Sequence, residues 1–366
     1  MHLEDGGRCV SFIKQEGIKQ VEVQKKERIF YLEFIRAFAT LSIILTHYNA
    51  LYIYMETPRL ENTILSVFPF GIYIGNLGVS LFFIISGAAL MYTYQDRLEV
   101  KKFFKKRFLS VYPMWWIAYT AAISYWFLTY KTFNPWSAEK WKILLTIIGF
   151  DHYFAHLTPT FAIVGEWFLG CIILLYLLFP IVRFGVVKYP RLSTATSIAL
   201  YLGFIKFNPW PLWPSVNVFV RLPEFLFGML FIRYIKGVNV KLLLLSLAVL
   251  IGTTIWNPSW DGNIKTTYIG IAFFLVLVYL SEFFKKNHTV KYICAKICKY
   301  SYAIFLSHHL VIYEIAKKFD LNTIGYWGSV MMLFVCIEFI VLVAFGLFHL
   351  HRILMLEMKN ASSQSI

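Results

Sequence analysis

Apolar residues in this chain form long runs separated by short polar segments, a pattern that predicts helices crossing a membrane. A membrane-spanning helix needs about 20 apolar residues, and Gly, Pro and charged residues mark the ends of the runs. The runs lie near 30–52, 71–94, 108–130, 161–182, 192–206, 219–235, 240–256, 266–283, 300–316 and 325–349. The expected fold is all-α: a polytopic membrane protein with about ten transmembrane helices.

Composition supports this interpretation and excludes an ordinary soluble domain. Of the 366 residues, 58% are hydrophobic and 15% are charged, whereas soluble domains average about 45–50% apolar and about 25% charged residues. The five cysteines lack the spacing of a zinc site or a disulfide framework, so we expect no metal. We expect a cytoplasmic segment 1–29, a membrane domain 30–349 and a cytoplasmic tail 350–366. An interfacial helix is expected around 136–150, where Trp and Lys alternate with aliphatic residues.

The positive charges indicate how the chain is oriented. Lys and Arg prefer the cytoplasmic side of a membrane. With the N-terminus inside, 25 of the 35 Lys and Arg residues fall in cytoplasmic segments and seven fall in the opposite loops. This split predicts that both termini are cytoplasmic. The net charge of +15 then reflects topology and attraction to anionic membrane lipids, and no nucleic-acid partner is expected.

Ionisable residues inside the first run are the strongest functional signal. An ionisable side chain in a span costs about 2.5–3.5 kcal/mol, so it calls for a reason. Arg36 and His47 are eleven residues apart, which places them on one helix face and about 16 Å apart along its axis. Glu33 precedes Arg36 by three residues and is expected to neutralise or orient it. Either residue alone would fit an interfacial arginine or a packed histidine; the shared face favours a functional site.

The basic segment before the third run has two interpretations. It contains Lys105, Lys106 and Arg107, which can hold the phosphates of a cytoplasmic ligand or can simply follow the rule that positive charges stay inside. The chain has no glycine-rich phosphate loop of the Walker or dinucleotide type, which argues against a nucleotide triphosphatase.

Four further polar residues are expected to support the site. Glu166 begins the fourth run, and Arg221 and Glu224, three apart in the sixth, can form an ion pair. His308 and His309 lie halfway along the ninth run, about 100° apart, so at most one of them can face the same cavity as His47. His308 is the one expected to act, as a competitor of His47.

Together these motifs resemble the acyltransferase-3 family of bacterial integral membrane acyltransferases. Its first-span signature, an arginine and a histidine separated by ten residues, matches Arg36 and His47. The stretches GVSLFFIISG, WFLG–LLFP, RLPEFLFG and SYAIFLSH, and the basic segment ending in Tyr-Pro, follow in family order. Two positions depart from the pattern: Glu33 replaces a frequent aspartate, and Ser110 stands where a second arginine is usual before Pro113, so donor binding must rely on Arg107 and the lysines.

The resemblance implies transfer of an acyl group, acetyl being the first expectation, from cytoplasmic acyl-coenzyme A to a hydroxyl of a cell-envelope or exported glycan or its lipid-linked precursor. It also implies a multi-pass protein of the bacterial cytoplasmic membrane, and no permanently bound cofactor is expected. His47 is predicted to be the general base, since an imidazole titrates near neutral pH, and Arg36 to hold the donor or shape its channel. The alternative is a membrane carrier or export component that uses the same polar residues as a pathway.

Overall fold

A computed structural model describes residues 28–133, 138–155, 157, 159–161, 164, 167–208 and 212–364, and the regular secondary structure of these residues is helical throughout. The α-helices are α1 (Phe30–Ile53), α2 (Ile74–Tyr94), α3 (Val100–Tyr130), α4 (Ile143–Ile148), α5 (Trp167–Lys188), α6 (Pro190–Phe207), α7 (Val218–Leu230), α8 (Val240–Trp256), α9 (Gly262–Phe284), α10 (His288–Ala316) and α11 (Tyr326–Gln364). Most apolar runs therefore fall on a single helix, while the run near 219–235 is divided between α7 and a π-helical turn, Phe231–Ile235, that continues it. The short α4 lies inside the expected interfacial segment.

Length and composition make five of the described helices candidate membrane spans. These are α1, α2, α5, α9 and the part of α11 up to Met358, while α8 is apolar but shorter. The chain is thus an all-helical protein with membrane-spanning candidates. Ten spans and the cytoplasmic location of both ends remain predictions.

Several helix boundaries differ from the sequence prediction, including the end of α5 at Lys188 instead of near residue 182. The predicted basic loops before the third and ninth runs are largely helical, because α3 begins at Val100 and α10 at His288. The predicted tail is also helical, since α11 continues without interruption past residue 349 to Gln364. Hydropathy marks where apolar residues stop, whereas Lys and Arg are good helix formers and extend a helix beyond that point.

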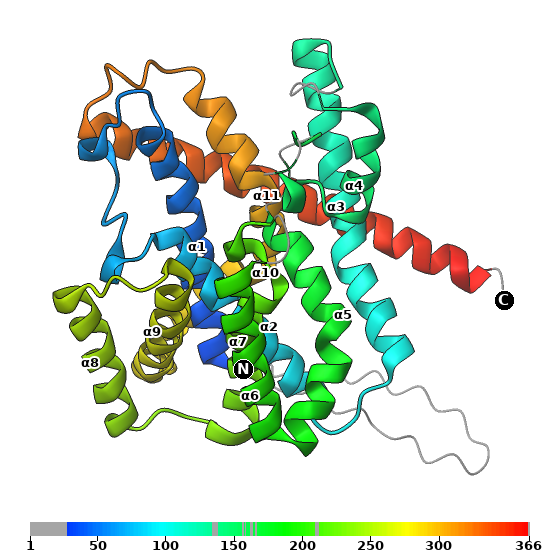
Figure 1. Ribbon diagram of the computed structural model, residues 1–366. Coiled ribbons are helices and arrows are strands. Elements are labelled where there is room, and N and C mark those ends of the chain that lie inside the picture. The colour runs from blue at the N-terminus through cyan, green and yellow to red at the C-terminus, as the bar shows by residue number, and fades with distance from the viewer. Residues whose placement is uncertain are drawn as a thin grey trace, which may run out of the picture.

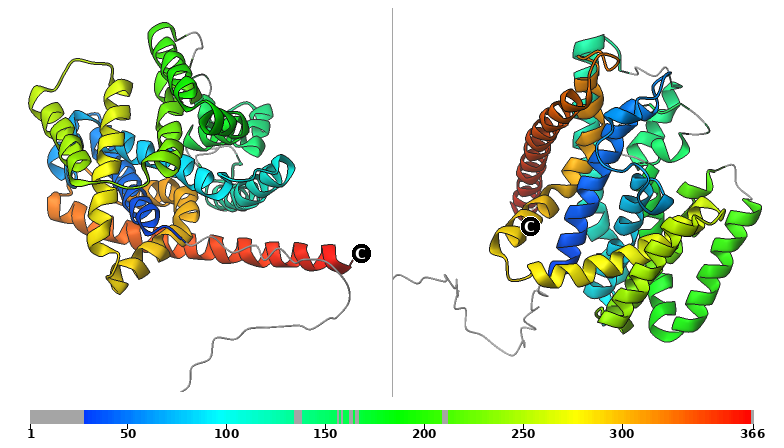
Figure 2. Two further views of the ribbon diagram at one scale, coloured as in Figure 1. Left: turned by 90° about the horizontal axis from the view of Figure 1, so that it is seen from below. Right: turned by 90° about the vertical axis from the view of Figure 1, so that its left-hand side faces the viewer.

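The helices α1 and α2 form the centre of the bundle (Figure 1). Helix α2 packs against α1, α7 and α9, and α1 packs against α2, α9 and α10. Helix α10 in turn contacts α3 and α11, and α11 runs along the outside of the bundle (Figure 2). This arrangement places the Arg36–His47 face of α1 among α2, α3, α5 and α10.

Two glycines allow α2 and α7 to touch through their backbones. A Cβ atom on Gly228 of α7 would lie 1.9 Å from the Ile84 carbonyl oxygen, and one on Gly87 of α2 would lie 1.9 Å from the Phe225 carbonyl oxygen. Small residues are the usual means of close helix packing in membranes. The α2–α7 contact therefore requires glycine on both sides.

Candidate active site

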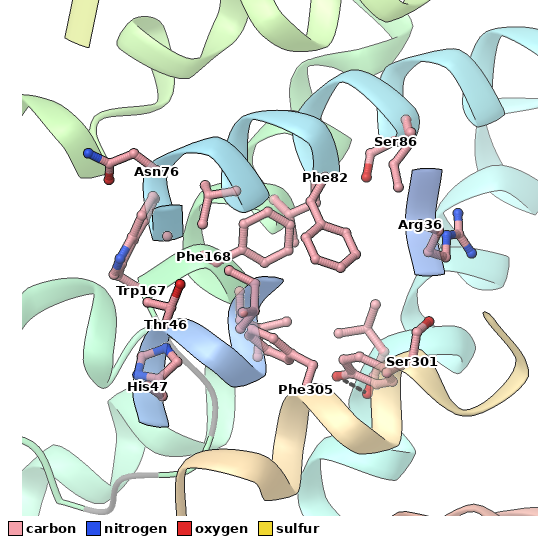
Figure 3. A pocket seen from close by; sticks show the side chains of 18 of the residues that line it. Arg36, Thr46, His47, Asn76, Phe82, Ser86, Trp167, Phe168, Ser301 and Phe305 are labelled. Atoms are coloured by element: carbon pink, nitrogen blue, oxygen red, sulfur yellow. Dashed lines mark hydrogen bonds between the residues drawn. The ribbon is translucent and has the colours of Figure 1, made fainter. Parts of the chain in front are cut away.

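Arg36 and His47 line one cavity of about 310 Å³ enclosed by α1, α2, α3, α5 and α10 (Figure 3). Both side chains come from α1, and they lie towards opposite ends of the cavity. Most of the wall between them is apolar, and Phe82, Phe168 and Phe305 contribute rings to it. The eleven-residue spacing therefore places a cation and an imidazole on the same cavity, as the helical periodicity predicts.

The Arg36 end of the cavity carries hydroxyl groups. Ser86 of α2 and Ser301 of α10 lie towards this end (Figure 3), and Ser110 of α3 also lines the cavity. Glu33 does not neutralise Arg36 as expected: its carboxylate lies 3.3 Å from the guanidinium of Arg28. No carboxylate from the described part of the chain forms an ion pair with Arg36, so its positive charge is available to a ligand.

The His47 end of the cavity also carries polar groups. Thr46 lies next to His47 there, and Trp167 lies between His47 and Asn76 (Figure 3). The Thr46 hydroxyl donates a hydrogen bond to the Ser42 carbonyl at 2.8 Å, which satisfies it within α1. His47 is therefore the ionisable group at this end that the cavity exposes among the described residues.

Three imidazoles meet where α1 contacts α10. The His47 ring centre lies 4.9 Å from that of His308 and 4.7 Å from that of His309. His308 is completely buried, and its Nδ1 lies 2.9 Å from the Phe305 carbonyl oxygen. Because a carbonyl oxygen only accepts, Nδ1 carries the proton, which fixes the tautomer and orientation of the ring. His308 therefore packs behind His47 instead of reaching the cavity.

His309, which the sequence analysis did not select, is half-buried and lies at a different cavity. It lines a second cavity, of about 460 Å³, to which His47 also contributes. Adjacent residues on a helix point about 100° apart, so only one of His308 and His309 was expected to share a cavity with His47. That residue is His309 and not His308. In the portion of the chain that is described, no group of three or more His, Cys, Asp or Glu side chains has the arrangement of a metal site.

Of the basic residues Lys105, Lys106 and Arg107, one lies beside the cavity and two lie on the surface. The Arg107 guanidinium lies 5.7 Å from the ring centre of Tyr176, a residue of the cavity wall, and its buried Nε has no hydrogen-bond partner among the described residues. Lys105 and Lys106 are exposed. Three consecutive helical residues point in three directions, so they cannot all face one small ligand. Of the three expected phosphate contacts, Arg107 is the one beside the cavity.

Two other cations of this basic segment are already compensated by one carboxylate. Lys102 pairs with Glu99 at 2.6 Å, and Arg97 lies 3.4 Å from the same carboxylate. The hydrogen bond from Lys102 lowers the pKa of the Glu99 carboxyl, so the acid stays ionised near neutral pH. Arg107, by contrast, forms no such pair among the described residues.

Arg221 and Glu224 form the ion pair that their spacing predicts, but behind the cavity wall. The two side chains are 1% and 0% exposed, and the Arg221 Nη1 lies 3.3 Å from Glu224 Oε1. The guanidinium also donates to the Ser215 carbonyl at 2.7 Å and lies 5.5 Å from the ring centre of Trp167. The pair therefore supports Trp167, which lines the cavity, and does not itself reach a ligand.

The remaining predicted residue, Glu166, lies outside the described residues. Several residues of the cavity had no signal in the sequence, because they come from other helices and are brought together only by packing. The hydroxyl-bearing Ser301 begins the SYAIFLSH stretch and could have been found there. The indole of Trp167 begins the WFLG stretch and could have been found in the same way, whereas the amide of Asn76 carried no such signal.

Apolar helices around a cavity lined by an arginine and a histidine are typical of a helical membrane protein with polar groups in its interior. A family model described as an acyltransferase domain matches residues 29–349. The chain therefore belongs to the acyltransferase-3 family and is a membrane acyltransferase. No curated protein and no solved structure matches the chain.

Proposed function

We propose that this protein transfers an acyl group, acetyl in the simplest case, from acyl-coenzyme A on the cytoplasmic side to a hydroxyl of a cell-envelope or exported glycan or its lipid-linked precursor. The observation that carries the proposal is the cavity with Arg36 towards one end and His47 towards the other. The proposal includes ten spans, both chain ends in the cytoplasm, and location in a bacterial cytoplasmic membrane.

The donor fits the basic end of the cavity. Coenzyme A carries phosphates, and guanidinium groups bind phosphate through paired charge-assisted hydrogen bonds. Arg107, beside the cavity wall, would take a phosphate group, and the thin pantetheine arm would extend past Arg36. The axial distance from Arg36 to His47 is about 16 Å, which the arm has to cover to bring the thioester to the imidazole.

His47 would act as the general base. It takes the proton of the acceptor hydroxyl while that oxygen attacks the thioester carbonyl carbon. The carbon–sulfur bond then breaks, the new ester remains on the acceptor, and the departing thiolate takes the proton from His47 to leave as coenzyme A thiol. A positioned base of this kind contributes about 10²–10⁴-fold to the rate. His308, packed against the His47 ring, would hold that ring in place.

The experiment compares single alanine variants of three histidines in cells and after purification. His47→Ala should remove acyl groups from envelope glycans, measured by mass spectrometry, while the purified protein still binds acetyl-coenzyme A. His349→Ala is the matched control, because His349 lies on α11 and its ring contacts only Phe345 and Phe348 among the ring contacts of the described residues.

Two results would contradict the assignment. If His308→Ala abolishes transfer while His47→Ala keeps about a tenth of it or more, His308 is the base. If neither variant changes glycan acylation, the chemistry is not located at this cavity, and a carrier function becomes the better interpretation.

A further inference from the structure

The second cavity continues the first along the same two helices. On α1, the first cavity extends from Arg36 to His47, and the second extends from His47 to Tyr54, the residue that follows the helix. On α10, the first is lined by residues from Ser301 to Phe305 and the second by residues from His309 to Ala316. The two cavities therefore lie end to end between α1 and α10, and His47 is the residue that lines both.

The three imidazoles form the partition between the cavities. The His47 ring lies within 5 Å of both other rings, measured between centres at 4.9 Å and 4.7 Å. His47 contributes to both cavities, His309 contributes to the second alone, and His308 is buried against His47 and lines neither. A base at this partition can touch one substrate on each side.

The lining of the second cavity suits an uncharged sugar. Tyr54, 78% exposed, and Phe319, 48% exposed, present aromatic surface near its rim. Its one cation, Lys317, is compensated by Glu314 at 2.9 Å. A cavity with aromatic walls, a few polar groups and no uncompensated charge among its described lining residues favours a neutral ligand with apolar faces and hydroxyl edges over a phosphate.

We propose that the second cavity is the acceptor site, and that it binds a neutral sugar ring whose hydroxyl points at His47. This inference rests on the proposed function and adds the place and class of the acceptor. His309 supplies a second imidazole that can hydrogen-bond the same sugar. The donor occupies the first cavity, approaching along α1 from Arg36, and the acceptor approaches from Tyr54, the residue that follows α1, about 10 Å beyond His47.

The test fills the second cavity without touching the first. Ala50 of α1 lines only the second cavity, so Ala50→Trp would place an indole in the sugar site. Leu41→Trp is the matched control, since Leu41 lies on the same helix, is 50% exposed and lines neither cavity. A double variant, Tyr54→Ala with Phe319→Ala, removes two exposed aromatic rings and tests the same site without adding bulk.

Three quantities are measured for each variant: its amount in the membrane, the affinity of the detergent-purified protein for acetyl-coenzyme A by calorimetry, and the acyl content of envelope glycans from cells. Ala50→Trp should reduce glycan acylation by at least about tenfold and leave acetyl-coenzyme A affinity within about twofold of the parent protein. The double variant should reduce acylation in the same direction, and Leu41→Trp should change neither quantity.

Normal acylation in both second-cavity variants, with acylation lost in His47→Ala, would overturn the acceptor site and leave the proposed function intact. Loss of acetyl-coenzyme A binding in both of them, with normal amounts in the membrane, would also overturn it, because the cavity would then belong to the donor. If His47→Ala and His308→Ala both retain acylation, the proposed function fails instead.

Discussion

Two arginines inside the helix bundle should respond in opposite ways to the same substitution. Arg221 is 1% exposed and paired with Glu224, whereas Arg36 is partly exposed to the cavity and forms no ion pair among the described residues. Replacing each arginine with Met retains a long unbranched side chain and removes the positive charge. The comparison distinguishes an arginine that stabilises the fold from one that binds a ligand.

The structure sets the expected magnitudes. Arg221→Met leaves the Glu224 carboxylate buried without its partner, and breaking a buried pair costs about 3–5 kcal/mol of stability. Arg36→Met breaks no ion pair and removes a charge that costs about 2.5–3.5 kcal/mol inside a span, so stability should be unchanged or higher. If Arg36 contacts the donor, losing a charged hydrogen bond of about 1.5–3 kcal/mol weakens acetyl-coenzyme A binding roughly 10- to 150-fold.

The assay pairs thermal unfolding of the purified proteins in detergent with calorimetric titration of acetyl-coenzyme A. We expect Arg221→Met to lower the unfolding midpoint and Arg36→Met to keep it while losing donor affinity. An Arg36→Met protein that unfolds early and binds donor normally would refute the reasoning, because Arg36 would then be structural.

Three further outcomes are expected. Arg107→Gln should weaken acetyl-coenzyme A binding in the same titration more than Lys105→Gln does, because Arg107 lies beside the cavity wall and Lys105 is exposed. Equal losses of affinity would mean that donor binding depends only on the net charge of the segment. Gly228→Ala should lower the unfolding midpoint, since its Cβ would lie 1.9 Å from a backbone carbonyl oxygen and overpacking costs about 1–3 kcal/mol, whereas Gly252→Ala, with nothing within 4 Å, should not. A reporter fused after residue 366 should read cytoplasmic and one at residue 134 external; a cytoplasmic signal at residue 134 would contradict the ten-span topology.

The sequence predicted the helices well because each apolar run is a local signal. It did not predict where α3 and α10 begin, since the basic residues that close an apolar run also favour helix. The shared face of Arg36 and His47 was predictable because it follows from the period of one helix. Such reasoning needs no knowledge of neighbouring helices.

Relations between helices were not predictable in the same way. The choice of His309 over His308 depends on how α10 is rotated against α1, which packing decides. Glu33 was expected to serve Arg36 because the two are three residues apart, but it pairs with Arg28 on the segment before the helix. Arg221 and Glu224 paired as their spacing allows, yet their place behind Trp167 follows from tertiary structure.

The histidine partition between the two cavities has a consequence for the permeability of the membrane. Under the proposed function, the charged coenzyme stays on one side of the partition and the sugar on the other, and only the small acyl group passes between them. Neither substrate has to cross the bilayer, so the protein needs no alternation between inward-open and outward-open states as a transporter does. An enzyme built in this way can acylate molecules outside the cell while the bilayer around it stays closed to ions.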